Sequence, residues 1–185
     1  GSFQIYNFYN TQNLKKNSII FFNLDETNEK FLSQLNQIKE NENIFSILST
    51  LKLIQYNNDN KNYEYSNELY KEIIFSSDLN DLYLSNVAAQ ASYTMIEASY
   101  IEKTNNYFED ISSYIDKIND NFESFFSIKM ELQYLLAVCE IDINKSEYKN
   151  NSEINDLYEQ IINSNLISSS VKERLKKIHE FQIYK

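Results

Sequence analysis

The sequence predicts an all-α protein made of antiparallel helix pairs, and three features lead to that prediction. Apolar residues recur at helical spacing along several segments of the 185 residues. Similar segments begin at Tyr70, Tyr114 and Tyr158, at equal intervals of 44 residues. The chain has a single glycine, Gly1, and no proline.

The shortage of glycine narrows both the fold and the function. The tight hairpins of a β-sheet usually need glycine at positive φ, so a sheet-rich fold is disfavoured. A glycine-rich phosphate loop, a dinucleotide-binding turn and a serine nucleophile elbow are excluded for the same reason. Asparagine is the next residue that visits the left-handed region, so we expect Asn-rich turns between the helices. We interpret Gly1 and Ser2 (residues 1–2) as the remnant of a cleaved tag.

Residues 3–40 are expected to form N-terminal helices that cap the following region and would link it to any membrane anchor. The stretch up to residue 22 is rich in aromatic and aliphatic residues but has weak helical periodicity. A short helix after it is clearer, and its inward residues should be Phe31, Leu32, Leu35 and Ile38.

Three long helices are predicted to begin near residues 43, 80 and 122, and Asp78 is the expected N-cap of the second. The first carries the stripe Ile44, Ile47, Leu48, Leu51 and Ile54. The second carries Leu84, Val87, Ala88, Ala91, Met95 and Ala98. The third carries Phe125, Ile128, Leu132, Leu135, Leu136 and Cys139. Each set follows the spacing of one helical face.

Shorter helices are predicted to alternate with the long ones. They are centred on the segments that begin at Tyr70, Tyr114 and Tyr158. A last helix should begin with a capping box of Ser170 and Glu173. Its apolar residues are Val171, Leu175, Ile178 and Phe181. Each unit is then a long helix, a polar turn and a short helix, which is typical of helix-pair solenoids, and residues 41–185 form this repeat domain.

Charge and composition argue against a nucleic-acid partner, a membrane-spanning segment and an internal disulfide. The net charge is -10, so a polyanion would be repelled over most of the surface, and nucleic acid is not expected as a partner. No run of 18 apolar residues is present, so no segment of this sequence is expected to span a membrane. Cys139 is the only cysteine, which rules out an internal disulfide.

The titratable residues do not predict a catalytic site, a cofactor or a metal. His179, the sole histidine, lies beside charged residues of the last helix and is expected to be an ordinary surface residue. Cys139 lies in an apolar stripe and is expected to be a buried thiol. The acidic pairs Glu40/Glu42, Asp110/Asp116 and Glu140/Asp142 lack calcium-loop spacing and are expected to be solvated.

A candidate protein-binding surface lies on the long helices, because helix-pair solenoids usually bind ligands on the concave side that these helices line. On the second long helix, a line separate from the apolar stripe comprises Asn86, Gln90, Tyr93 and Glu97. On the third, Ser127, Met130 and Tyr134 are placed similarly. Tyrosine and methionine beside amides suit adaptable peptide binding. The alternative is that these side chains pack on a neighbouring helix.

Three segments resemble the tetratricopeptide-like family of YfgM-type envelope proteins, which includes the ancillary subunit of the bacterial SecYEG translocon. They are YEYSNELYKEIIFSSDLNDLYLSNVAAQASYTMIE, ISSYIDKINDNFESFFSIKMELQYLLAVCEID and LYEQIINSNLISSSVKERLKKIHEF. Together the resemblance covers about residues 20–183. It implies a short, right-handed tetratricopeptide-like solenoid.

The resemblance also implies a function and a location. The native chain would have one N-terminal transmembrane helix in the inner membrane, with this domain in the periplasm. It would be a non-enzymatic scaffold or chaperone-like module whose partners are translocon subunits or envelope clients. A secreted or surface protein that contacts host components is the alternative, and an enzyme with a carboxylate site is the third hypothesis.

Overall fold

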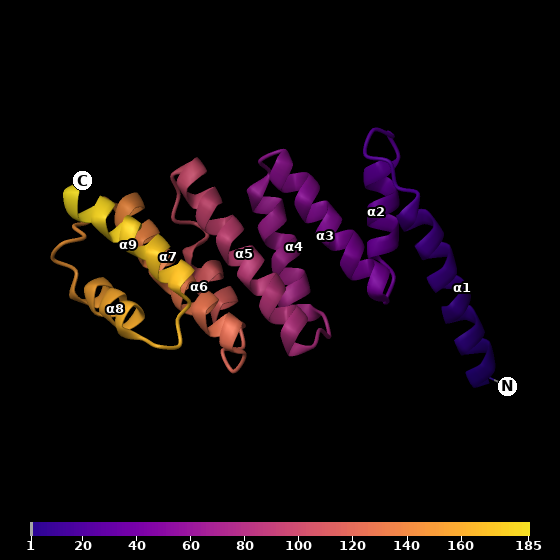
Figure 1. Ribbon diagram of the computed structural model, residues 1–185. Coiled ribbons are helices and arrows are strands. Elements are labelled where there is room, and N and C mark those ends of the chain that lie inside the picture. Colours follow the sequence, from indigo (N-terminus) through magenta and orange to yellow (C-terminus); the bar gives the residue numbers. More distant parts are fainter. Residues whose placement is uncertain (1) are drawn as a thin grey trace. The chain divides into compact units, whose positions relative to one another are not determined.

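The computed structural model describes residues 2–185 and, except for residues 2, 3, 6 and 9, their side chains. Every regular element in this range is an α-helix (Figure 1), so the all-α prediction is confirmed. The chain divides into two compact units, of which the first ends at Ser77 and the second comprises Asp78–Lys185. The boundary expected at residue 40 falls inside the first unit, because the helices on either side of it pack together.

The first unit holds four helices: α1 (Ser2–Phe22), α2 (Phe31–Lys39), α3 (Ile44–Asp59) and α4 (Tyr63–Ser76). Helix α3 packs against the other three. On α2 the expected inward residues are buried except Leu32, which is exposed. On α3, Ile54 is buried as expected, but Ile44 is exposed and Leu53 is buried instead. The other predicted residues, Ile47, Leu48 and Leu51, are half-buried, and Ile44 is exposed at the first position of the helix.

The second unit holds five helices: α5 (Asp81–Glu102), α6 (Phe108–Asp116), α7 (Glu123–Asn144), α8 (Ser152–Asn163) and α9 (Ser169–Tyr184). The three long helices thus begin within a residue of the predicted positions. Helix α7 packs against α5, α6, α8 and α9. On α5, Ala88, Ala91 and Ala98 are fully buried, and the helix packs against α6 and α7.

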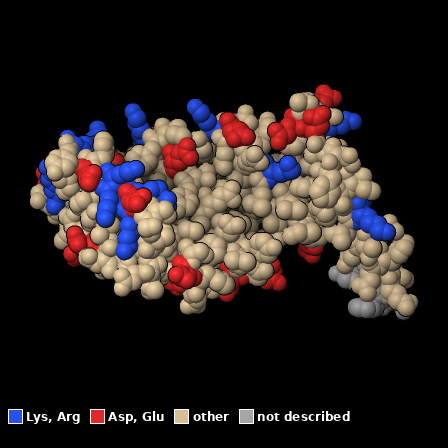
Figure 2. Space-filling model, in the orientation of Figure 1, with Lys and Arg blue, Asp and Glu red and all other residues tan. Residues whose placement is uncertain are grey.

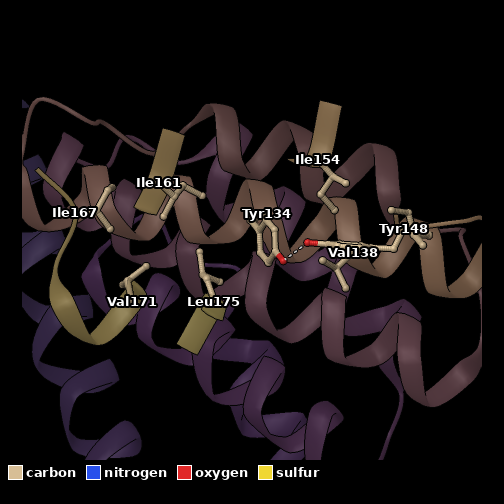
Figure 3. Close-up of a cluster of buried hydrophobic side chains, with 9 residues drawn as sticks. Tyr134, Val138, Tyr148, Ile154, Ile161, Ile167, Val171 and Leu175 are labelled. Carbon is tan, nitrogen blue, oxygen red and sulfur yellow. Dashed lines mark hydrogen bonds between the residues drawn. The ribbon is translucent and has the colours of Figure 1, made fainter. Parts of the chain in front are cut away.

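A buried cluster joins α7, α8 and α9 (Figure 3). Its members are Tyr134, Val138, Ile141, Tyr148, Ile154, Ile161, Ile167, Val171 and Leu175. Tyr134 and Tyr148 are hydrogen-bonded through their hydroxyl groups at 2.6 Å, which satisfies both polar groups inside the apolar cluster. The cluster fixes the last two helices on α7.

Two helices have N-cap residues other than those predicted. Asn80, not Asp78, caps α5, because its side chain accepts a hydrogen bond from the Tyr83 amide. Ser168, not Ser170, caps α9, because it has the extended backbone of an N-cap and its Oγ accepts from the Val171 amide. Both predictions were wrong by two residues, since several polar residues in each turn could cap and only the backbone conformation selects one.

The left-handed residues of the turns are lysines rather than the expected asparagines. Among the described residues, positive φ occurs at Lys61, Lys103 and Lys145, which are 42 residues apart. Each lies at the end of a long helix, α3, α5 or α7. Just after each lysine, an amide bonds back across the helix end: Asn62 to Asn57, Thr104 to Ser99, and Ser146 to Ile141. This is the Schellman pattern, which satisfies a helix-end carbonyl and ends the helix.

Replacing Lys103 by glycine should stabilise the protein. The left-handed conformation costs an L-residue about 1–2 kcal/mol, and glycine avoids this cost. The greater conformational freedom of glycine in the unfolded chain offsets part of that gain. We expect Lys103→Gly to add about 0.5–1 kcal/mol to the free energy of unfolding, measured by urea denaturation. The matched control, Lys176→Gly inside α9, should lose about 1 kcal/mol. A loss of stability in both variants would contradict the turn analysis.

Candidate interaction face

The four candidate residues on α5 lie on one exposed line. Asn86, Gln90, Tyr93 and Glu97 are all exposed, and their spacing of four, three and four residues places them on one side of the helix. Tyr93 is 37 % exposed, so its ring is open to solvent over part of its surface. This half of the predicted surface is available to a partner.

The three candidate residues on α7 lie in the interior of the second unit. Tyr134 is fully buried in the cluster of Figure 3, and Ser127 is buried as well. Ser127 Oγ donates to the Leu166 carbonyl at 3.3 Å and accepts from the Ser168 amide at 3.1 Å. Met130 is half-buried against the same cluster. The placement of these three on an open surface was wrong, because the side of α7 that carries them is covered by α8, α9 and their connections.

Glu131, the neighbour of Met130, is the α7 residue that meets the exposed line of α5. The hydroxyl of Tyr93 donates to Glu131 Oε2 at 3.1 Å. Arg174 of α9 donates from Nε to Oε1 at 2.9 Å and from Nη2 to Oε2 at 2.8 Å. The Glu131 side chain is 5 % exposed, whereas that of Arg174 is 55 % exposed. A buried carboxylate therefore joins three helices through a bidentate ion pair and a phenol.

A second carboxylate of α7, Asp142, repeats the arrangement further along the helix. Its Oδ2 accepts from the Tyr100 hydroxyl at 2.9 Å. Its Oδ1 accepts from Gln182 Nε2 at 3.0 Å and from Lys185 Nζ at 2.8 Å. Tyr100 belongs to α5, and Gln182 to α9. The same three helices are therefore joined twice.

The two clusters lie on one side of the second unit. Tyr93 and Tyr100 are seven residues apart, which is two helical turns, and both pairs Glu131/Asp142 and Arg174/Lys185 are eleven residues apart, which is three. We call the surface that these six residues form the α5–α7–α9 face. Its sequence signal is weak: a glutamate inside an apolar helix, with a second acid three turns later.

Burial and hydrogen bonding shift the pKa values of residues in the face. Burial, and then the Glu131 carboxylate, raise the pKa of Tyr93, and burial with the hydrogen bond to Asp142 raises that of Tyr100. Burial alone would raise the pKa of Asp142, but the hydrogen bonds from Lys185, Gln182 and Tyr100 outweigh it and lower that pKa. Near neutral pH both phenols are therefore protonated donors, and the two residues, 37 % and 40 % exposed, are held in place by these hydrogen bonds.

His179 was predicted to be an ordinary surface residue, but its side chain packs and hydrogen-bonds within the fold. Its Nδ1 is hydrogen-bonded to the Tyr148 hydroxyl at 2.7 Å. Its ring stacks on Tyr158, with centroids 3.9 Å apart and planes inclined by 7°. Tyr158 is the third residue of the repeating tyrosines, and here it holds the last helix, whereas Tyr70 and Tyr114 are fully buried. The prediction failed because the partners of His179 come from segments 21 and 31 residues away.

Among the remaining titratable candidates, Cys139 is a buried free thiol, as predicted. Cys139 is fully buried, and burial raises the pKa of its thiol to about 12, so it is protonated near neutral pH. No group of three or more His, Cys, Asp or Glu that could hold a metal occurs among the described residues. A pocket of about 320 Å³ between α7 and α8 is open to solvent and is lined in part by Glu140, Asn144 and Asn151.

The fold defines the class of this chain: over residues 2–185 it is an all-helical protein, and within each of its two units neighbouring helices pack on one another. Comparison with protein-family models, with curated proteins and with solved structures finds no match in any of the three. Within the described range, none of the helices combines the length and the apolar character needed to cross a membrane.

Removal of the Arg174 charge alone should lower the free energy of unfolding more than removal of both charges of the ion pair. Arg174→Met leaves the buried Glu131 carboxylate without its cation, and we expect a loss of about 2 kcal/mol because Arg174 is itself half exposed. The double variant Glu131→Leu/Arg174→Met should be more stable than Arg174→Met, because no charge is left buried. The stability of both variants is measured by the protection of the single cysteine, Cys139, from thiol labelling in increasing urea. Equal stability of the two variants would show that Glu131 does not depend on Arg174.

Asp142 should make stability depend on acid pH in a predictable direction. Because folding lowers its pKa, the carboxylate stabilises the fold above about pH 5, and this contribution is lost as the pH falls through the lowered value, below about 4. Asp142→Asn should therefore be less stable than the wild type at neutral pH, and the difference should shrink in acid. Urea midpoints at several pH values measure it. Asp116→Asn, at an exposed position of α6, is the control. The difference between its urea midpoint and that of the wild type should not shrink as the pH falls.

Proposed function

We propose that this chain is a non-enzymatic protein-interaction module that binds a segment of another protein through the α5–α7–α9 face and the exposed line of α5. In the finer form of the proposal, its helix pairs stack as a short, right-handed tetratricopeptide-like solenoid. The order of packing in the second unit, in which α5 meets α6 and both meet α7, supports this stacking.

The observation that carries the proposal is the fixed position of two partly exposed tyrosines. Tyr93 and Tyr100 present their rings to solvent while their hydroxyl groups are bound to Glu131 and Asp142. A side chain that is already held in one conformation loses little entropy when a partner covers it. Tyrosine is also among the residues that contribute most to protein interfaces. Beside them, Asn86 and Gln90 offer donors and acceptors for a peptide backbone.

The cellular setting of the proposal rests on the sequence resemblance alone. In that setting the native chain is anchored in the inner membrane with this domain in the periplasm, and its partners are translocon subunits or envelope clients. It acts as a scaffold or chaperone-like module there.

Site-specific crosslinking tests whether this face binds protein. A photoreactive phenylalanine analogue in place of Gln90 should crosslink to a partner in cells that produce the protein. The same analogue in place of Glu159, exposed on α8, is the matched control and should not yield that adduct. Tyr93→Ala should weaken the Gln90 adduct about tenfold, because it removes a ring but leaves the Glu131–Arg174 pair intact. Equal adducts from Gln90 and Glu159, or none from Gln90, would overturn the proposal.

A further inference from the structure

The last helix, α9, has a charge opposite to that of the rest of the chain. From Ser169 to its C-terminal neighbour Lys185 the segment carries five basic residues, Lys172, Arg174, Lys176, Lys177 and Lys185, against Glu173 and Glu180. Its net charge is +3, while the whole chain has -10, so the remainder carries -13. Figure 2 shows Lys and Arg side chains gathered over the place that α9 occupies in Figure 1.

One side of α9 continues the α5–α7–α9 face with basic and aromatic side chains. Arg174, Lys177, Phe181 and Lys185 recur at spacings of three, four and four, which is one line along a helix. Phe181 had been expected in the apolar stripe, yet it is 64 % exposed, and the adjacent Gln182 is turned inward to Asp142 instead. The aromatic ring of Phe181 is thus left at the surface between the cations of Arg174 and Lys185.

The cations of this line have unused hydrogen-bond donors. Arg174 gives Nε and Nη2 to Glu131, and its Nη1 donates in no hydrogen bond of the described residues. Lys185 gives Nζ to Asp142, which uses one of its three donors. Lys177 is exposed, and the structure of residues 2–185 shows no ion pair or hydrogen bond for its side chain. Carboxylates from outside could therefore bind here without displacing the internal bonds.

We propose that the basic line of α9 binds an acidic segment of a partner protein. Carboxylates of the segment contact Arg174, Lys177 and Lys185, and an apolar side chain between them covers Phe181. This inference rests on the proposed function, since the same segment then continues across Tyr93 and Tyr100. It names the chemistry of the partner: the chain as a whole has a net charge of -10, but residues 169–185, which carry the basic line, have a net charge of +3.

A short acidic segment fits better than a larger anionic surface. At physiological ionic strength a charge is felt over about 8 Å, so a peptide laid on α9 experiences mainly the local cations. A bilayer or a nucleic acid extends over the whole molecule and meets the net charge of -13 on the remainder. The segment's own charge also steers it to α9, because the acidic remainder repels it.

Fluorescence anisotropy with defined peptides and the full chain tests the inference. The probe is a labelled peptide of about 12 residues with alternating glutamate and leucine pairs, and its counterpart has glutamine at every glutamate. We expect the acidic peptide to bind at least about tenfold more tightly than the glutamine peptide, with the difference falling as salt rises. Equal affinity of the two peptides would overturn the inference.

Two charge reversals on the same helix locate the site. Lys177→Glu places a negative charge in the basic line and should weaken the acidic peptide about tenfold. Lys176→Glu makes the same change one residue away, on another side of α9, and should change the affinity less than about twofold. Phe181→Ala, at an exposed position, should weaken binding about tenfold without loss of folding. Equal effects of the two reversals would overturn the proposed site.

Vesicles and the crosslinking experiment separate the remaining outcomes. Retention of the chain on vesicles containing about one-third anionic lipid, without binding of the acidic peptide, would assign the basic line to a membrane surface and overturn the inference. A protein adduct at Gln90 without preference for the acidic peptide would overturn this inference and leave the proposed function standing. Binding of the acidic peptide that depends on Lys177, without an adduct at Gln90, would place the partner on α9 and overturn the proposed use of α5.

Discussion

The buried carboxylate of Glu131 is the constraint on which the second unit depends. A carboxylate removed from water must be paired and hydrogen-bonded, or the fold loses more than a typical side-chain contact provides. Arg174 and Tyr93 supply those bonds from α9 and α5, so the carboxylate fixes both helices relative to α7. Asp142 repeats the constraint three turns later with Tyr100, Gln182 and Lys185. The need to pair these two carboxylates therefore fixes the positions of two tyrosine rings and two cations at the surface.

The turns show how a chain without internal glycine ends its long helices. Lys61, Lys103 and Lys145 take the left-handed conformation at equal intervals, although an L-residue pays for it. A lysine at that place is favoured electrostatically by the negative end of the helix, which offsets part of the cost. The repeat is therefore clearer in these turns than in the apolar positions, where Tyr158 departs from Tyr70 and Tyr114 to stack on His179.

Helix α9 has one side that is packed in the second unit and another side that is exposed. Val171 and Leu175 belong to the buried cluster, and Gln182 is turned inward, so this side of the helix holds the unit together. Lys177 and Phe181 on another side take no part in that packing and remain exposed. A helix that is fixed by one side can present the other in a defined position, which lowers the entropic cost of binding. The opposite charge of α9 and of the remaining chain is the basis of the proposed preference of this side for an acidic partner.

The sequence by itself determined the all-helical class, the start of each long helix and the apolar stripes of α5 and α7, because helical periodicity and the lack of glycine and proline act locally. It also separated Asn86, Gln90, Tyr93 and Glu97 from the apolar stripe of α5, and all four are exposed. Only the tertiary structure decided which side of α7 meets α5. Successive residues on a helix point about 100° apart, so the step from Met130 to Glu131 separates a residue packed on the core cluster from one bonded across the face. The bonds of Glu131 and His179 come from helices distant in sequence, and no local pattern contains that information.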